Sequence, residues 1–175
     1  MRLLPSHPLS LALAATSLAA GPASRDQPEY QIKASFVMIL AEYVSWPGTA
    51  GGRSLVLGIQ GAAAGAPLRD SSLFARGVKG RPLELRYFDN PKDCEGCDIV
   101  FICESEASRL PELLTRLRSR PILTIGDSPG LAQRGVMINL FREGPRVQFE
   151  INLAALRASG LDIRSNVLKL AKMVE

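Results

Sequence analysis

One pentapeptide matches the pattern of a catalytic serine that follows a strand: Gly126-Asp127-Ser128-Pro129-Gly130. A serine hydrolase needs a general base that takes the proton of the serine hydroxyl, most often a histidine. The only histidine in the chain is His7, near the amino terminus, and Pro129 lacks the backbone N–H that usually completes an oxyanion hole. We therefore interpret this motif as a turn after a strand.

Three cysteines form a second group with possible chemistry: Cys94, Cys97 and Cys103. The spacing Cys94-x-x-Cys97 suits a redox or metal half-site, but neither a second cysteine pair nor a nearby histidine is present to complete a zinc site. A thioredoxin-like role is disfavoured, because that motif opens a helix and this pair precedes a strand. In an oxidising compartment we expect Cys94 and Cys97 to form a small disulfide loop. Cys103 is expected to be a buried core thiol.

Acidic residues surround the cysteine pair, at positions 89, 93, 95 and 98. A weak cation site is conceivable there, but a solvated acidic loop is the simpler interpretation. No complete nucleotide-binding or phosphate-binding motif is found. The sequence therefore indicates no cofactor and no metal, and it disfavours an enzyme.

Residues 1–23 have the pattern of a secretory leader. Arg2 precedes an apolar run at 9–20, LSLALAATSLAA, which is too short to span a membrane but suits the core of a signal peptide. Cleavage after Ala19 and cleavage near Ala23 both stay open. We expect an exported protein that does not itself span the membrane, with residues 24–175 as a single domain.

The charge of the exported chain gives little indication of nucleic-acid binding. Removing residues 1–23 leaves 20 basic and 17 acidic residues, a net charge of +3. No run of basic residues is interleaved with aromatic residues, so no nucleic acid is expected as a partner. The full chain is 46% hydrophobic, which suffices for one domain with its own core.

Strand-like and helix-like patterns alternate along residues 24–175. Three segments are continuously apolar, as in strands covered on both faces: 54–59, 98–103 and 121–125. An alternating segment at 83–87 is typical of a strand nearer an edge. Helical patterns occupy 30–44, 68–75, 110–119, 153–159 and 164–175. This order predicts an α/β fold: a three-layer α/β/α sandwich with a mixed, mainly parallel sheet that ends in an antiparallel hairpin.

The hairpin is also the expected site of partner binding. Its first strand, 136–141, is apolar, and its second strand alternates, with Val147, Phe149 and Ile151 on one face. Asn152 is expected to cap a short helix that Gly160 ends. The expected partner-binding residues are the polar row on the other face of the strand and two residues of the helix: Arg146, Gln148, Glu150, Leu156 and Arg157. An apolar anchor rimmed by charges is a usual interface composition. The alternative, that these are ordinary surface and core residues, stays open.

Several stretches together resemble the YfiR-like family of periplasmic repressors of membrane-bound diguanylate cyclases. The matching stretches lie at 32–36, 43–47, 57–58, 97–102, 122–125, 135–140 and 149–153, with Ala158, Gly160, Leu161 and Ser165. The resemblance covers nearly all of residues 24–175, and the order and spacing of the stretches are more specific than any one of them.

The resemblance implies a non-enzymatic periplasmic regulator. Such a protein binds the periplasmic sensor region of an inner-membrane diguanylate cyclase, lowers cyclic-di-GMP and releases the cyclase under envelope or redox stress. Disulfides tune stability in the family, but this chain has no cysteine in its final hairpin. A homodimer stays open. The alternative function is a periplasmic small-molecule-binding α/β domain that uses the crevice at the carboxyl ends of the central strands.

Overall fold

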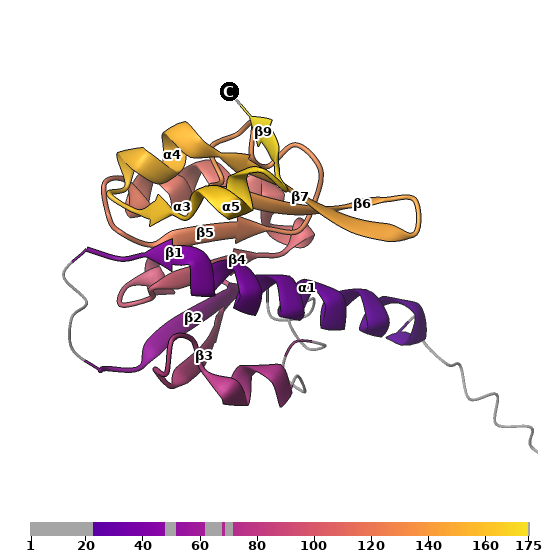
Figure 1. Cartoon of the computed structure of the whole chain (residues 1–175), viewed down its shortest axis with the longest axis horizontal. Helices are drawn as coiled ribbons and strands as arrows, with labels where there is room; N and C mark the ends of the chain where they lie inside the picture. The colour runs from indigo at the N-terminus through magenta and orange to yellow at the C-terminus, as the bar shows by residue number, and fades with distance from the viewer. Residues whose placement is uncertain (1–22, 48–51, 62–67, 69–71, 175) are drawn as a thin grey trace, which may run out of the picture.

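The computed structural model describes residues 23–47, 52–61, 68 and 72–174 (Figure 1). The expected leader, residues 1–23, lies outside the described part except for Ala23. Ala23 is the first residue of α1 (Ala23–Tyr43), which begins seven residues before the helix expected at 30–44. The expected helix at 68–75 is described only in part, as the 3₁₀ helix η1 (Ser72–Arg76).

Seven described strands form one mixed sheet, in the order β3-β2-β4-β5-β6-β7-β9. The strands are β2 (Leu55–Gln60), β3 (Leu83–Phe88), β4 (Ile99–Ile102), β5 (Leu123–Gly126), β6 (Ile138–Glu143), β7 (Arg146–Asn152) and β9 (Lys172–Val174). The strands from β3 to β6 are parallel, whereas β7 pairs with β6 as an antiparallel hairpin. The predicted mixed, mainly parallel sheet is confirmed, and β3 lies at one edge as its alternation indicated.

The central strands are buried on both faces because both sets of their alternating side chains are apolar. On one face, Leu57, Ile59 and Phe101 pack with α1 and η1 in one core cluster. On the other face, Val56, Val100 and Ile102 pack with the second cluster. That cluster includes residues of α3 (Leu110–Leu117) and η2 (Pro91–Cys94), near η3 (Glu104–Arg109). The three layers are therefore helices, sheet and helices, as predicted.

Helix α1 lies alongside the β6–β7 hairpin (Figure 1). The ring of Phe36 meets the ring of Phe149 of β7, with 5.8 Å between centroids. The helix ends where the chain becomes β1 (Val44–Ser45), which pairs antiparallel with β8 (Asp162–Ile163). Backbone pairing at this end and ring packing along its length therefore hold α1 to the carboxyl-terminal third of the chain.

The segment after the hairpin matches the predicted cap. The Asn152 side chain accepts a hydrogen bond of 2.8 Å from Ala155 N at the start of α4 (Leu153–Ala158). Gly160, at φ 79°, follows the helix in the left-handed conformation that glycine adopts without strain.

The expected terminal helix at 164–175 is wrong for most of its length. The helix α5 ends at Leu168 (Ser165–Leu168), and β9 then adds to the sheet as a parallel neighbour of β7. Leu170, which follows α5, is 76% exposed. The apolar spacing alone did not reveal that β7 presents an open edge with which the chain can pair.

Candidate functional site

The predicted polar row on β7 is exposed only at its outer end. Arg146 is exposed and Gln148 is half-buried, but Glu150 is only 4% exposed, so its expected place in the solvent is wrong. The Glu150 carboxylate accepts hydrogen bonds from Asn139 Nδ2 at 2.9 Å and from Gln133 Nε2 at 3.3 Å. The predicted alternation of β7 side chains is right. The face that carries Glu150 is not open to solvent there, because the chain around Gln133 covers it.

The two partner-binding residues expected on α4 also differ in exposure. Leu156 is fully buried in the core, so it cannot act as an exposed apolar anchor, whereas Arg157 is exposed. Arg146 begins β7 and Arg157 follows its other end, and six residue steps of strand span about 20 Å. Glu150 and Leu156, being buried, therefore cannot belong to an exposed contact patch, whereas Arg146, Gln148 and Arg157 stay a prediction.

The three cysteines are buried free thiols in this structure, so the predicted disulfide between Cys94 and Cys97 is not formed here. Cys97 N donates to Cys94 O at 3.2 Å, which makes the pair the ends of a β-turn. Such a turn holds its end Cα atoms within about 7 Å, which is compatible with a disulfide. Burial raises the pKa of Cys97 to about 11 and also raises the pKa of Cys94. Both thiols are therefore weak nucleophiles at neutral pH. Cys103 is fully buried, as expected.

The acidic residues near the cysteines do not form a metal site within the described parts of the chain. Asp98 is buried instead, and its carboxylate binds Arg53 Nη1 at 2.8 Å, Arg53 Nη2 at 2.5 Å and Val56 N at 2.9 Å. These bonds tie the start of β2 to the start of β4, so Asp98 has a structural role.

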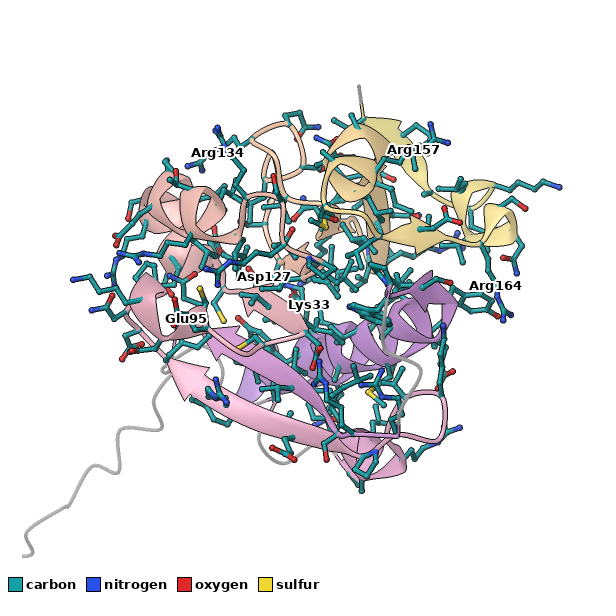
Figure 2. All side chains as sticks on the ribbon, turned by 90° about the vertical axis from the view of Figure 1, so that its left-hand side faces the viewer. Lys33, Glu95, Asp127, Arg134, Arg157 and Arg164 are labelled. Atoms are coloured by element: carbon teal, nitrogen blue, oxygen red, sulfur yellow. The ribbon has the colours of Figure 1, made fainter. Side chains whose placement is uncertain are left out.

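A buried polar cluster that the sequence analysis missed lies at the carboxyl ends of the central strands. It comprises Glu29, Tyr30 and Lys33 of α1 with Asp127, which follows β5. The Lys33 ammonium lies 2.8 Å from Glu29 Oε1, 3.1 Å from the Asp127 carbonyl oxygen and 3.8 Å from Asp127 Oδ2. The Tyr30 hydroxyl donates to Asp127 Oδ2 at 3.2 Å. Figure 2 shows Lys33 and Asp127 within the molecule and Arg157 at its periphery. The available signal was one lysine on the helix face that also carries the apolar residues Val37 and Leu40.

Burial determines the electrostatics of this polar cluster. The Asp127 side chain is 1% exposed, and burial raises the pKa of its carboxyl group, against the opposing effects of Lys33 and Tyr30. Asp127 Oδ1 has no hydrogen-bond partner within the described chain. The pKa of Tyr30 is also raised, first by burial and then by Asp127. The cluster thus fastens α1 over the sheet edge at which α/β proteins commonly bind ligands. Ser128 beside it is buried as well.

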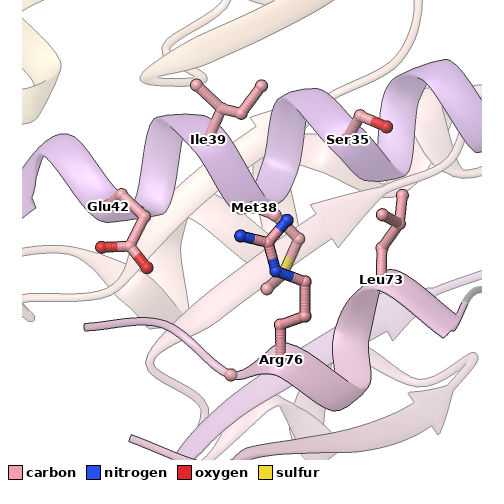
Figure 3. Close-up of a pocket in the computed structure, with 7 residues that line it drawn as sticks. Ser35, Met38, Ile39, Glu42, Leu73 and Arg76 are labelled. Atoms are coloured by element: carbon pink, nitrogen blue, oxygen red, sulfur yellow. The ribbon is translucent and has the colours of Figure 1, made fainter. Parts of the chain in front are cut away.

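A surface groove follows the outer side of α1. Its first part is a pocket of about 290 Å³ between α1 and η1, lined by Ser35, Met38, Ile39, Glu42, Leu73, Arg76 and Gly77. Arg76 reaches from η1 toward α1 in this pocket (Figure 3). Ile39 and Glu42 also line the next depression, together with Tyr43, Lys79 and Arg164. We call the two parts together the α1 groove.

A tight turn places Lys79 at the α1 groove. Val78 and Arg81 exchange two backbone hydrogen bonds of 2.9 Å, with Lys79 at φ 52° and Gly80 at φ 71° between them. Two positive φ values in succession are typical of a type I′ turn. The Glu42 carboxylate accepts a hydrogen bond of 2.7 Å from Lys79 N, and Lys79 Nζ donates to the carbonyl oxygen of Val44. The strained backbone of Lys79 is therefore held directly by α1.

The described residues contain no helix that is both long and apolar enough to cross a membrane.

A family model described as YfiR/HmsC-like matches residues 30–172, well over half of the 175 residues. The matched segment contains the described sheet as far as the first residue of β9, and most of α1. It includes the α1 groove and every residue of the polar cluster except Glu29.

Two solved structures have a similar fold. A conserved domain protein from Vibrio cholerae O1 biovar El Tor has a TM-score of 0.58 at 13% identity, covering 81% of this chain and 60% of that chain. An ABC domain from Streptococcus pneumonia in complex with L-Trp has a TM-score of 0.54 at 12% identity, covering 70% of this chain and 55% of that chain. This chain thus spans less than two thirds of either solved chain. At such low identity the likeness supports the α/β fold alone.

Proposed function

Because the chain belongs to the YfiR/HmsC-like family, we propose that it represses an inner-membrane diguanylate cyclase by binding the cyclase's periplasmic sensor region. Members of this family are periplasmic regulators of diguanylate cyclases. The repression would lower cyclic-di-GMP and would require only protein–protein contact, without a reaction catalysed by this chain. The observation that carries the proposal is the family match across residues 30–172.

The buried polar groups fit a regulator better than a hydrolase. A reacting serine must be accessible and close to a base, whereas Ser128 is buried and the sequence's only histidine is His7. Asp127, the nearest acid in sequence, already binds Lys33 and Tyr30. These side chains serve the packing of α1 in our proposal.

Arg146 and Gln148 of β7 and Arg157 of α4 stay proposed contacts for the cyclase. Arg146 and Arg157 are exposed, and each can pair with an acidic group at the rim of an interface. Glu150 and Leu156 contribute differently in this proposal, because they hold the hairpin and α4 in place from inside the protein.

The decisive experiment reconstitutes repression. Membrane vesicles that carry a candidate cyclase, with its periplasmic region accessible, are mixed with the purified protein, and the synthesis of cyclic-di-GMP from GTP is measured. We expect a saturable decrease in synthesis, together with co-sedimentation of the protein and the vesicles. A cyclase that lacks its periplasmic region is the matched control and should be insensitive. Undiminished synthesis with no co-sedimentation, for every membrane cyclase of the source cell, would refute the proposal.

The alternative, a periplasmic small-molecule-binding domain, has one observation in its favour. The pocket between α1 and η1, about 290 Å³, is large enough for a small ligand, and the similar ABC domain holds L-Trp. Against it, Tyr30 and Lys33 of α1 bond to Asp127 at the carboxyl end of β5, where a ligand of an α/β domain would bind. Native mass spectrometry of the purified protein separates the two functions, because a retained small molecule would favour the alternative.

A further inference from the structure

We propose that the α1 groove receives an acidic amphipathic helix of the partner protein. This inference rests on the proposed function and specifies where and by what chemistry the partner binds. The groove is distinct from the hairpin and α4 residues expected from the sequence.

The floor of the α1 groove presents apolar side chains to solvent. Ile39 is 55% exposed although it lies in the middle of α1. Ile32, two helical turns earlier on the same face but outside the residues that line the groove, is 45% exposed. Met38 and Leu73 line the adjoining pocket and are half-buried. Isolated exposed apolar residues are ordinary, but here the exposed Ile39 lies between two depressions that share it. Such a row can accept apolar residues that recur at helical spacing on a partner helix.

The rim of the α1 groove is positively charged. Arg76, Lys79 and Arg164 line it, with Glu42 as the only acidic residue among the described lining residues. No salt bridge joins any of the three cations to a carboxylate of the described chain. The Glu42 carboxylate is already engaged by Lys79 N. The rim therefore carries three cations that form no salt bridge with the carboxylates of the described residues.

The cations at the rim lie close enough to affect one another. The pKa of Lys79 is lowered, first by burial and then by the charge of Arg164, with Glu42 opposing. The guanidinium of Arg164 lies over the ring of Tyr43, 5.9 Å from its centroid, and Lys79 Nζ lies 5.9 Å from the centroid of Trp46. These ring contacts and the Glu42 bond hold Lys79 and Arg164 in position before any partner arrives. A preformed site loses less conformational entropy on binding.

Charge complementarity selects the occupant. A carboxylate placed between Lys79 and Arg164 would relieve their mutual repulsion, and apolar residues beside it would cover Ile39. A second copy of this chain fits less well, because a two-fold contact through the same patch would bring the two sets of cations together. The apolar face of an acidic amphipathic helix would cover the floor of the groove, and its carboxylates would pair with the cations of the rim.

The test uses two synthetic helical peptides with the same leucine face, one flanked by glutamates and the other by lysines, and measures their binding to the purified protein by fluorescence anisotropy. We expect the acidic peptide to bind, and to bind more weakly as salt rises. The basic peptide should not bind. Ile39→Asp and the double variant Arg76→Glu/Arg164→Glu should each weaken binding by about tenfold or more. The control variant Arg118→Glu reverses an exposed charge just after α3, on the opposite side of the sheet from α1. It should leave peptide binding unchanged.

The same variants are then tested against the cyclase vesicles, after circular dichroism has shown that they fold. Loss of both peptide binding and repression in the groove variants supports the inference. Repression that survives in those variants overturns it and leaves the proposed function intact. Peptide binding without any effect on a cyclase would refute the proposed function while the groove chemistry stands. Dimerisation in analytical ultracentrifugation that Ile39→Asp abolishes would instead identify a second copy as the occupant and overturn the inference.

Discussion

The Lys33 ammonium of α1 lies 3.1 Å from the Asp127 carbonyl oxygen and 3.8 Å from the Asp127 carboxylate, although 94 residues separate them in sequence. Both side chains are almost completely buried, with exposed fractions of 6% and 1%. This pair joins the first helix to the carboxyl edge of the parallel sheet. The same helix carries the α1 groove on its outer side, so the buried pair also fixes the position of the proposed binding surface.

Replacing Lys33 by methionine should destabilise the protein strongly. The Asp127 carboxylate would stay buried without its cation, and breaking such a pair typically costs about 3 kcal/mol. Urea denaturation of the wild type and of Lys33→Met, Asp127→Asn and the double variant measures this cost. We expect the double variant to be more stable than Lys33→Met, because it removes the uncompensated charge. Equal stabilities for the wild type and Lys33→Met would show that the pair does not hold α1.

Asp127 should also make stability depend on pH. Its pKa in the folded protein is raised above the value of about 3.9 in an unfolded chain. Between these two values the folded state binds more protons, so the contribution of Asp127 to the free energy of unfolding decreases as pH rises. This contribution is most favourable below about pH 4, and it stops changing above the pKa of Asp127 in the folded protein. Urea denaturation at a series of pH values measures the free energy of unfolding of the wild type minus that of Asp127→Asn. This difference should decrease as pH rises. A difference that rises with pH would contradict it.

Much of the fold could be predicted because local patterns determine it. The continuous apolar runs became the buried strands β2, β4 and β5. The predicted cap at Asn152 forms as expected, because a cap involves only residues three positions apart. The helical pattern expected at 30–44 ends within one residue of the observed end of α1 at Tyr43.

The rest of the site depends on contacts between distant segments, which local patterns do not contain. Alternation separated Glu150 from Phe149, but it could not indicate that Gln133 covers the polar face. Lys33 gave no indication of its partner, because Asp127 reaches it only through the folded sheet. The terminal segment is apolar at helical spacing, yet Lys172–Val174 pairs with β7 because tertiary pairing overrides a weak local preference.

The burial of Glu150 separates its role from that of Arg146. Glu150→Ala would leave the buried amide group of Asn139 without its acceptor and remove the acceptor of the exposed Gln133. It should lower the free energy of unfolding by about 1–3 kcal/mol. Arg146→Ala, on the exposed end of the same strand, should change it by less than about 0.5 kcal/mol. Urea denaturation of the two variants measures both values. A Glu150→Ala variant as stable as the wild type would show that these hydrogen bonds contribute nothing net.

The cysteine pair provides a prediction about compartment. In the oxidising periplasm we expect Cys94 and Cys97 to form a disulfide, because their turn brings them close enough. Alkylation of the denatured, unreduced protein from the periplasm should then label Cys103 alone, as read by mass spectrometry. Reduction should allow all three cysteines to be labelled after denaturation. The loop is short, so reduction should lower the free energy of unfolding by only about 2 kcal/mol.

Labelling under native conditions distinguishes burial from oxidation. The reduced, folded protein should react slowly with iodoacetamide at neutral pH, because the three thiols are buried and the raised pKa of Cys97, about 11, leaves little thiolate. Variants with serine at Cys94 or at Cys97 serve as matched controls, since each removes the disulfide and keeps the other thiol. Three labelled cysteines in denatured, unreduced periplasmic protein would exclude the disulfide. A redox release of the partner through this pair would be excluded with it.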